Sequence, residues 1–181
     1  LASLTKVVAT TPAVMMLVEE GRIRLTDPVA TFIPEFAKYG KDRVTVRDLL
    51  THMSGLRPDL DLGDPWLGKD EAIRLATEEV LTDPPGRRFV YSDINFILLG
   101  EVVRRVSRTP LHEFVAREIY RPLRMGDTGF LPPAGKLARI APTTADEGEG
   151  ILRGRVHDPT ARRMGGVAGH AGLFFTAADL A

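Results

Sequence analysis

The sequence contains no cysteine and carries no excess of either charge. The missing cysteine excludes disulfides, cysteine-ligated zinc and thiol chemistry, and it is compatible with oxidising and reducing compartments alike. Lysine and arginine together number 24, and aspartate and glutamate also number 24. Nucleic-acid-binding proteins normally show a basic excess or stripe, so this balance argues against a nucleic-acid partner.

Long apolar runs and targeting signals are missing as well. No unbroken apolar run reaches the roughly 18 residues of a membrane span, so we expect no transmembrane segment. No basic-then-apolar leader opens the chain, which begins at Leu1. A helical pattern begins almost at residue 1, and a capping box from Thr176 to Asp179 opens another helix just before residue 181. We therefore expect one partial domain, residues 1–181, truncated at both ends.

The composition is that of a globular protein with a core. Hydrophobic residues make up 44% and charged residues 27% of the 181 residues, which is enough for one domain. Apolar residues recur at helical spacing in several segments. Helices are predicted over residues 2–20, 69–81, 94–107 and 111–120, and a short one between Thr45 and Gly55.

The remaining segments lack helical periodicity. Pro12 lies inside the first predicted helix, so we expect a kink or a helix that begins again there. Residues 131–163 are polar with glycine and proline, and are predicted to be irregular. Residues 165–172 are a glycine-rich loop, and 173–175 a short buried extended piece.

Ser3 and Lys6 form an S-x-x-K motif at the start of the first predicted helix. Residues i and i+3 share a helical face, so the lysine amine can reach the serine hydroxyl. A serine hydroxyl needs an adjacent base to act as a nucleophile, and the free N–H groups of a helix N-terminus favour developing negative charge. The simpler explanation is a serine helix cap and a solvated lysine. The motif alone is common and decides nothing.

A second candidate, Tyr91-Ser92-Asp93, stands just before the apolar helix 94–107. Ser92 or Asp93 could simply cap that helix, with Tyr91 half-buried. Alternatively, Tyr91 is a second base or proton shuttle. A phenol has an ordinary pKa near 10, so this role requires a cation such as Lys6 beside it.

Taken together and in order, these segments resemble the family of class C β-lactamases, DD-peptidases and related esterases. The resemblance is weakest over residues 57–80 and 131–155. The segments that carry it are "ASLTKV", "LVEEGRIRLTDPV", "VTVRDLLTHMSGL", "PPGRRFVYSDINFILLGEVVRRVSRTPLHEFV", "IYRPLRMGDTGF" and "GGVAGHAGLFFTAADLA".

The resemblance implies a role for each motif residue. Ser3 matches the acylated serine of the family, Lys6 its paired lysine, and Tyr91 the tyrosine of its Y-x-N motif. Asp93 stands where many members have an asparagine that hydrogen-bonds a substrate amide. An ionised carboxylate cannot donate that bond, which counts against efficient recognition of β-lactams or peptides and leaves ester hydrolysis open.

The histidines and the glycine-rich loop invite other assignments. His170-Ala171-Gly172 looks like the family's third motif, His-x-Gly, but its setting before a capped helix argues against an edge strand. We expect the true third motif, and a second oxyanion-hole N–H, beyond residue 181. His52 is predicted to be hydrogen-bonded and half-buried, and His112 solvated. No recognised metal spacing or nucleotide-binding βαβ loop is present, so no metal or cofactor is expected.

The resemblance implies an α+β fold of the serine β-lactamase/transpeptidase type, of which this chain supplies a mainly helical portion with little of the sheet. It implies a serine hydrolase that acts by acyl transfer on a peptide, β-lactam or small ester. The alternative is a non-catalytic penicillin-binding or sensor module that forms a stable acyl adduct. A helical scaffold without a site would leave Ser3 no more reactive than Ser54. The resemblance also suggests a periplasmic or secreted location.

Overall fold

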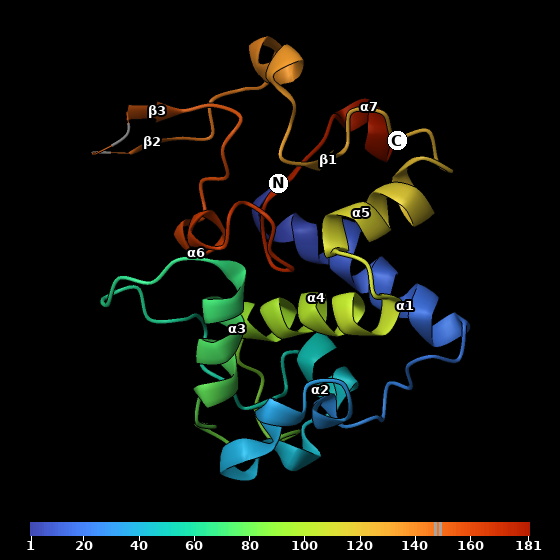
Figure 1. Cartoon of the computed structure of the whole chain (residues 1–181), viewed down its shortest axis with the longest axis vertical. Helices are drawn as coiled ribbons and strands as arrows, with labels where there is room; N and C mark the ends of the chain where they lie inside the picture. Colours follow the sequence, from blue (N-terminus) through green and yellow to red (C-terminus); the bar gives the residue numbers. More distant parts are fainter. Residues whose placement is uncertain (147, 149) are drawn as a thin grey trace.

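The computed structural model of the chain describes residues 1–146, 148 and 150–181. The structure is mainly helical, with two small antiparallel sheets (Figure 1). The α-helices are α1 (Thr11–Glu19), α2 (Val46–Leu50), α3 (Lys69–Glu78), α4 (Asp93–Ser107), α5 (Leu111–Val115), α6 (Pro159–Arg163) and α7 (Ala177–Leu180). The other helical segments are η1 (Ala2–Leu4), η2 (Lys6–Thr10), η3 (Val29–Thr31), η4 (Pro34–Arg43), η5 (Ala116–Tyr120) and η6 (Ala134–Arg139).

The two sheets are two-stranded hydrogen-bonded pairs. Strands β1 (Gly129–Phe130) and β4 (Leu173–Phe174) pair across a long stretch of chain, and β2 (Thr144–Asp146) and β3 (Gly150–Leu152) form a hairpin. The prediction that residues 131–163 are irregular is wrong for this hairpin, for η6 and for α6. The short extended piece predicted at 173–175 is confirmed as β4.

Helix α4 is the centre of the core, with α1 and α5 on one side and α2 and α3 on the other (Figure 1). Ten consecutive residues, from Ile94 to Val103, are buried, so the helix is enclosed on all sides. An apolar sequence of this kind is typical of a helix without a solvent face. The site described below lies at the N-terminal end of α4.

The first helix differs from the simple prediction over residues 2–20. It starts as a 3₁₀ turn, widens to a π-helical segment at Lys6–Thr10, and continues as α1 from Thr11. Pro12 would clash with the carbonyl four residues earlier in a regular α-helix, and a π turn changes that register. The expectation of a helix that begins again at Pro12 is thus confirmed to within one residue.

This same stretch qualifies the expectation that no segment could span a membrane. Ala2–Glu19 is an 18-residue helical stretch with a mean hydropathy of 1.2, which is long and apolar enough by length and composition. Its buried residues include Lys6 and Thr10 as well as Leu17, and it packs against α4. These contacts are with other helical segments of the same chain.

The ends of several helices are fixed as the sequence predicts. Thr45 and Asp48 make a reciprocal capping box at α2, and Thr176 accepts a hydrogen bond from the Asp179 N–H at α7. Gly169 lies so close to α4 that an added Cβ would be 1.9 Å from the Phe96 carbonyl oxygen. The glycine-rich loop is therefore held tightly against the central helix.

Candidate functional site

Ser3 and Lys6 meet at the start of the first helix, as the motif spacing predicts. The Lys6 Nζ is 2.8 Å from the Ser3 Oγ, and only 3% of the Lys6 side chain is exposed. Ala2, just before Ser3, has a φ of 47°, which residues other than glycine rarely adopt. Such strain is typical of functional sites. The pair is therefore not the capping serine and solvated lysine of the simpler explanation.

Asp93 joins this pair from the first turn of α4. Its Oδ1 is 2.6 Å from the Lys6 Nζ, and its backbone N–H donates to the Pro58 carbonyl at 2.6 Å. A third acceptor, the His170 backbone carbonyl, is 3.5 Å from the same amine. The amine thus donates hydrogen bonds to the Ser3 Oγ and the His170 carbonyl, and its contact with the Asp93 Oδ1 is an ion pair. The three acceptors fix the direction of the amine, one of them being the Ser3 hydroxyl oxygen.

Tyr91 lies beside Lys6, but its ring faces the amine. The Nζ is 4.7 Å from the ring centroid, a cation–π arrangement, and the tyrosine is 47% exposed. Ser92, which lies between Tyr91 and Asp93 in the sequence, is buried. Its Oγ donates to the Arg57 carbonyl at 2.6 Å, so it does not cap α4 through its side chain. The structure thus brings Ser3, Lys6, Tyr91 and Asp93 together around one amine.

His52 supports the tyrosine from behind. The two rings stack with centroids 4.5 Å apart and an interplanar angle of 30°. The His52 Nδ1 accepts from the Ser92 N–H at 3.1 Å, which assigns the proton of the neutral ring to Nε2. Burial, and then the positive charge of Lys6, lower the pKa of His52 below its ordinary value. The predicted hydrogen-bonded His52 is confirmed, although it is more fully buried than expected, at 9% exposure.

A contact between two residues near the amine, Asp158 and His170, was not predicted from the sequence. The His170 Nε2 is 2.9 Å from the Asp158 Oδ1, and His170 is only 1% exposed. Burial would raise the pKa of Asp158, but its contact with His170 holds that pKa below the ordinary value. Nearby, burial raises the pKa of Asp59, whose Oδ2 accepts from the Thr160 hydroxyl at 3.0 Å. No sequence motif links these residues, because three separate loops bring them together.

Asp93, Asp158 and His170 present possible ligand atoms that all lie within 4.8 Å of one another. A metal ion there would compete with the Lys6 ammonium, which already lies 2.6 Å from Asp93. A metal ion and the Lys6 ammonium that share one carboxylate in a buried site would repel each other strongly. We therefore assign no metal to these residues, and the absence of a metal stays a prediction.

The other residues weighed from the sequence lie outside this cluster. Ser54 is buried and donates to the Asn95 Oδ1 at 2.6 Å, and His112 is half-exposed on α5. His170-Ala171-Gly172 lies in the loop between α6 and β4. This position agrees with the expectation that the segment is not an edge-strand motif.

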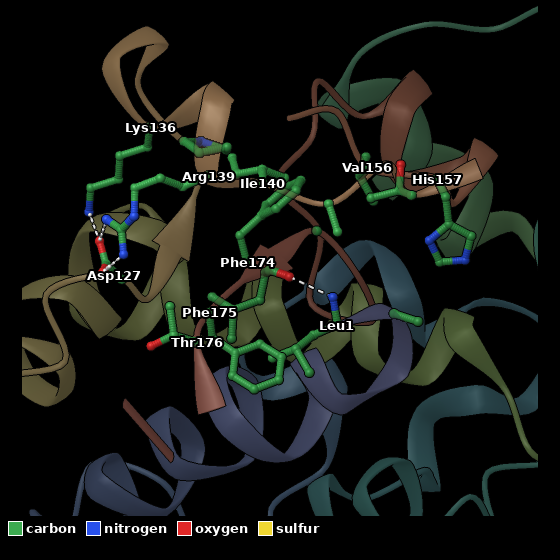
Figure 2. Close-up of a pocket in the computed structure, with 16 residues that line it drawn as sticks. Leu1, Asp127, Lys136, Arg139, Ile140, Val156, His157, Phe174, Phe175 and Thr176 are labelled. Carbon is green, nitrogen blue, oxygen red and sulfur yellow. Dashed lines mark hydrogen bonds and ion pairs between the residues drawn. The ribbon is translucent and has the colours of Figure 1, made fainter. Parts of the chain in front are cut away.

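A separate cavity of 310 Å³ lies where the start of the chain meets β4 (Figure 2). Leu1 forms part of its wall, and its backbone nitrogen donates to the Leu173 carbonyl at 2.9 Å. On another wall, the Asp127 carboxylate pairs with Lys136 at 2.9 Å and Arg139 at 2.7 Å (Figure 2). The Asp127 carboxylate offsets only one of these two positive charges. The lining does not include Ser3, Lys6, Tyr91 or Asp93, so this cavity is not the candidate site.

Comparison with known proteins identifies the family. The beta-lactamase family model matches residues 1–181, so the chain belongs to the beta-lactamase family. A protein of Escherichia coli strain K12 described as a putative D-alanyl-D-alanine carboxypeptidase is 34% identical over 209 residues, covering 100% of this chain and 48% of that protein. The chain thus spans about half the length of the curated relatives it matches.

Solved structures show the same fold. A penicillin-binding protein homologue from Caulobacter crescentus matches with a TM-score of 0.76 and 30% identity, over 100% of this chain and 53% of that one. FmtA from Staphylococcus aureus matches with a TM-score of 0.80 and 24% identity, over 99% and 49%. The predicted serine β-lactamase-like fold, present here as a mainly helical portion with little sheet, is confirmed.

Proposed function

We propose that this protein is a serine hydrolase that acts by acyl transfer on a peptide, β-lactam or small ester. The observation that carries the proposal is the buried Lys6 amine, 2.8 Å from the Ser3 hydroxyl oxygen. This separation is within the reach that a general base needs to accept a proton. Membership of the beta-lactamase family supports the same chemistry.

In the acylation step, Lys6 first gives up a proton; the Ser3 Oγ then attacks the substrate carbonyl carbon while its own proton moves to the Lys6 Nζ. The carbonyl oxygen becomes an oxyanion, and the Ser3 backbone N–H, in the first turn where helical acceptors are missing, is one donor to it. Collapse expels the alcohol, amine or β-lactam nitrogen, which takes up a proton from the Lys6 ammonium. A water molecule then attacks the acyl carbon, the bond from that carbon to the Ser3 Oγ breaks, and a proton from the water passes through Lys6 to the Ser3 Oγ, so that the acid leaves and the hydroxyl is restored.

Asp93 and Tyr91 have different roles in this proposal. Asp93 is the counter-ion of the Lys6 ammonium, at 2.6 Å, and its carboxylate has no proton with which to bind a substrate carbonyl. Tyr91, with its ring over the amine and 47% exposure, stands between Lys6 and solvent. Its hydroxyl is a route for the proton between the amine and the leaving group.

The test is intact-mass spectrometry of the complete natural polypeptide after exposure to a fluorophosphonate and, separately, to a penicillin. We expect one adduct, which maps to Ser3 and is lost in Ser3→Ala. The matched control is Ser54→Ala, which removes a buried serine outside the site and should leave labelling unchanged.

The outcomes distinguish a hydrolase, a penicillin-binding or sensor protein, and a helical scaffold without a site. A penicillin adduct that disappears with time identifies a hydrolase, and one that persists favours a penicillin-binding or sensor role. No adduct with either probe on folded protein would rule out acyl transfer at Ser3 and leave a helical scaffold. The periplasmic or secreted location belongs to the same proposal, and fractionation of the native cells tests it.

A further inference from the structure

The glycine-rich loop, residues 165–172, and the strand residue that follows it are bonded to the helix that carries Ser3. Four hydrogen bonds connect them: Thr10 Oγ1 to the Gly169 carbonyl (2.7 Å), Lys6 Nζ to the His170 carbonyl (3.5 Å), the Leu173 N–H to Thr5 Oγ1 (3.2 Å), and the Leu1 backbone nitrogen to the Leu173 carbonyl (2.9 Å). The partners follow one another in opposite directions along the two segments. The loop therefore runs antiparallel to the start of the helix and is hydrogen-bonded along it.

On its other side, the His170 side chain bonds the loop to the N-terminal end of α6. Its Nε2 is 2.9 Å from the Asp158 Oδ1, and the same oxygen accepts the Ala161 N–H at 2.7 Å. Asp158 is the N-cap of α6, so its carboxylate is fixed by a helix end. An imidazole that is 1% exposed and bonded to a fixed carboxylate has little freedom to turn.

His170 reaches the lysine in two ways. Its backbone carbonyl is an acceptor for Lys6 Nζ, and its ring lies with Asp158 within 4.8 Å of Asp93, the counter-ion of that amine. A lysine side chain has four flexible carbons, so its amine must be directed by its acceptors. Of the three acceptors around this amine, the His170 carbonyl is the one that belongs to neither Ser3 nor α4.

We propose that the Asp158–His170 pair is a positioning pair for Lys6. It holds the glycine-rich loop so that the His170 carbonyl and the Asp93 carboxylate direct the amine onto the Ser3 hydroxyl. The inference rests on the proposed function, because it assigns a role only if Lys6 activates Ser3. Neither residue touches the reacting atoms, so both act through the lysine.

The test compares paired substitutions in the complete natural polypeptide. His170→Ala removes the bond to Asp158, whereas His170→Gln places an amide N–H donor where Nε2 lies. Asp158→Ala removes both bonds, and Asp158→Asn keeps an acceptor for His170 and a good helix N-cap. His112→Gln, on the half-exposed histidine of α5, is the control for the loss of a histidine.

The readout is the kinetics of Ser3 labelling by the fluorophosphonate, separated into the probe affinity and the limiting acylation rate. Misplacement of a catalytic group by about 1 Å can cost roughly 100-fold, so we expect the Ala variants to lose roughly 10- to 100-fold in the limiting rate. The probe affinity should stay within about twofold, because binding surfaces are unchanged. His170→Gln and Asp158→Asn should lose less, about two- to tenfold relative to wild type.

Melting temperatures and near-ultraviolet circular dichroism separate positioning from folding. If an Ala variant does not fold, the Gln and Asn variants still decide, because they must label more slowly than wild type by less than about tenfold and remain folded. Wild-type rates in folded Ala variants would overturn the inference, as would equal losses in the Gln and Ala variants. A stoichiometric zinc that is lost in His170→Gln would overturn it too, because the ring would then be a metal ligand.

Failure of the inference is distinct from failure of the proposed function. If wild-type protein labels at Ser3 but the paired variants do not differ from it, only the positioning role is wrong. If wild-type protein does not label, the proposed function itself is wrong.

Discussion

Gly169→Ala is the sharpest test of how closely the glycine-rich loop is packed against α4. An added Cβ would lie 1.9 Å from the Phe96 carbonyl oxygen and 3.2 Å from the Gly100 nitrogen. Both contacts are with the backbone of the central helix, which cannot move aside as a side chain can. The loop itself must therefore shift.

The size of the shift follows from these distances. An ordinary contact begins at 3.4 Å, so relief of the overlap requires a displacement of about 1.5 Å. Overpacking of this kind costs about 1–3 kcal/mol, and loss of the 2.7 Å bond from Thr10 to the Gly169 carbonyl adds about 1 kcal/mol. We expect the free energy of unfolding to fall by about 2–4 kcal/mol.

Urea unfolding followed by circular dichroism measures this change. Gly135→Ala is the matched control, because an added Cβ there meets nothing within 4 Å and its φ is not in the left-handed region. That variant should be unchanged or slightly stabilised. A Gly169→Ala protein within about 0.5 kcal/mol of wild type would refute the close packing of loop and helix.

Three further predictions concern the cap of α2, the pH dependence due to His52 and the substrate preference set by Asp93. Thr45→Ala breaks the capping box with Asp48 and should lower the free energy of unfolding by about 1 kcal/mol in a urea titration; no change would show that the cap is dispensable. Because burial and the charge of Lys6 lower the pKa of His52, the folded state disfavours the imidazolium, so stability should be full above about pH 6.5 and fall below it. Measured by urea unfolding, the free energy of unfolding should fall less between about pH 8 and about pH 5.5 in His52→Gln than in wild type. An equal fall in the two proteins would contradict the predicted direction. Asp93→Asn supplies an amide donor and should raise the ratio of penicillin to ester acylation about tenfold, whereas an unchanged ratio would show that Asp93 does not select substrates.

The parts of the fold that could be predicted from sequence are those with a local cause. Helix α4 was recognised because its apolar residues are continuous, and the start of α7 because Thr176 and Asp179 have the spacing of a capping box. The hairpin of β2 and β3 could not be found, because its strands are three residues long and largely exposed where burial is described. Periodicity carries little information over so short a polar segment.

The candidate site divides in the same way. Ser3 and Lys6 were found because they stand three positions apart in a helix, and their geometry follows from that spacing. The Asp158–His170 pair was missed, since its two residues lie on either side of α6 and meet only through the tertiary path of the loop. The Tyr91 ring faces the Lys6 amine because it stacks on His52, and no local sequence pattern indicates this contact.

The bonds between the Ser3 helix and the glycine-rich loop have a consequence for folding kinetics. The Leu1–Leu173 and Thr10–Gly169 pairs are separated by 172 and 159 residues along the chain. Contacts of such high sequence separation form slowly, because the loop-closure entropy must be overcome before they stabilise anything. Helix α4, by contrast, is a local structure that can form early. In pulse-labelling hydrogen exchange during refolding, protection of the Leu173 amide should follow that of α4, and the Ser3–Lys6 arrangement would be among the last parts of the molecule to be completed.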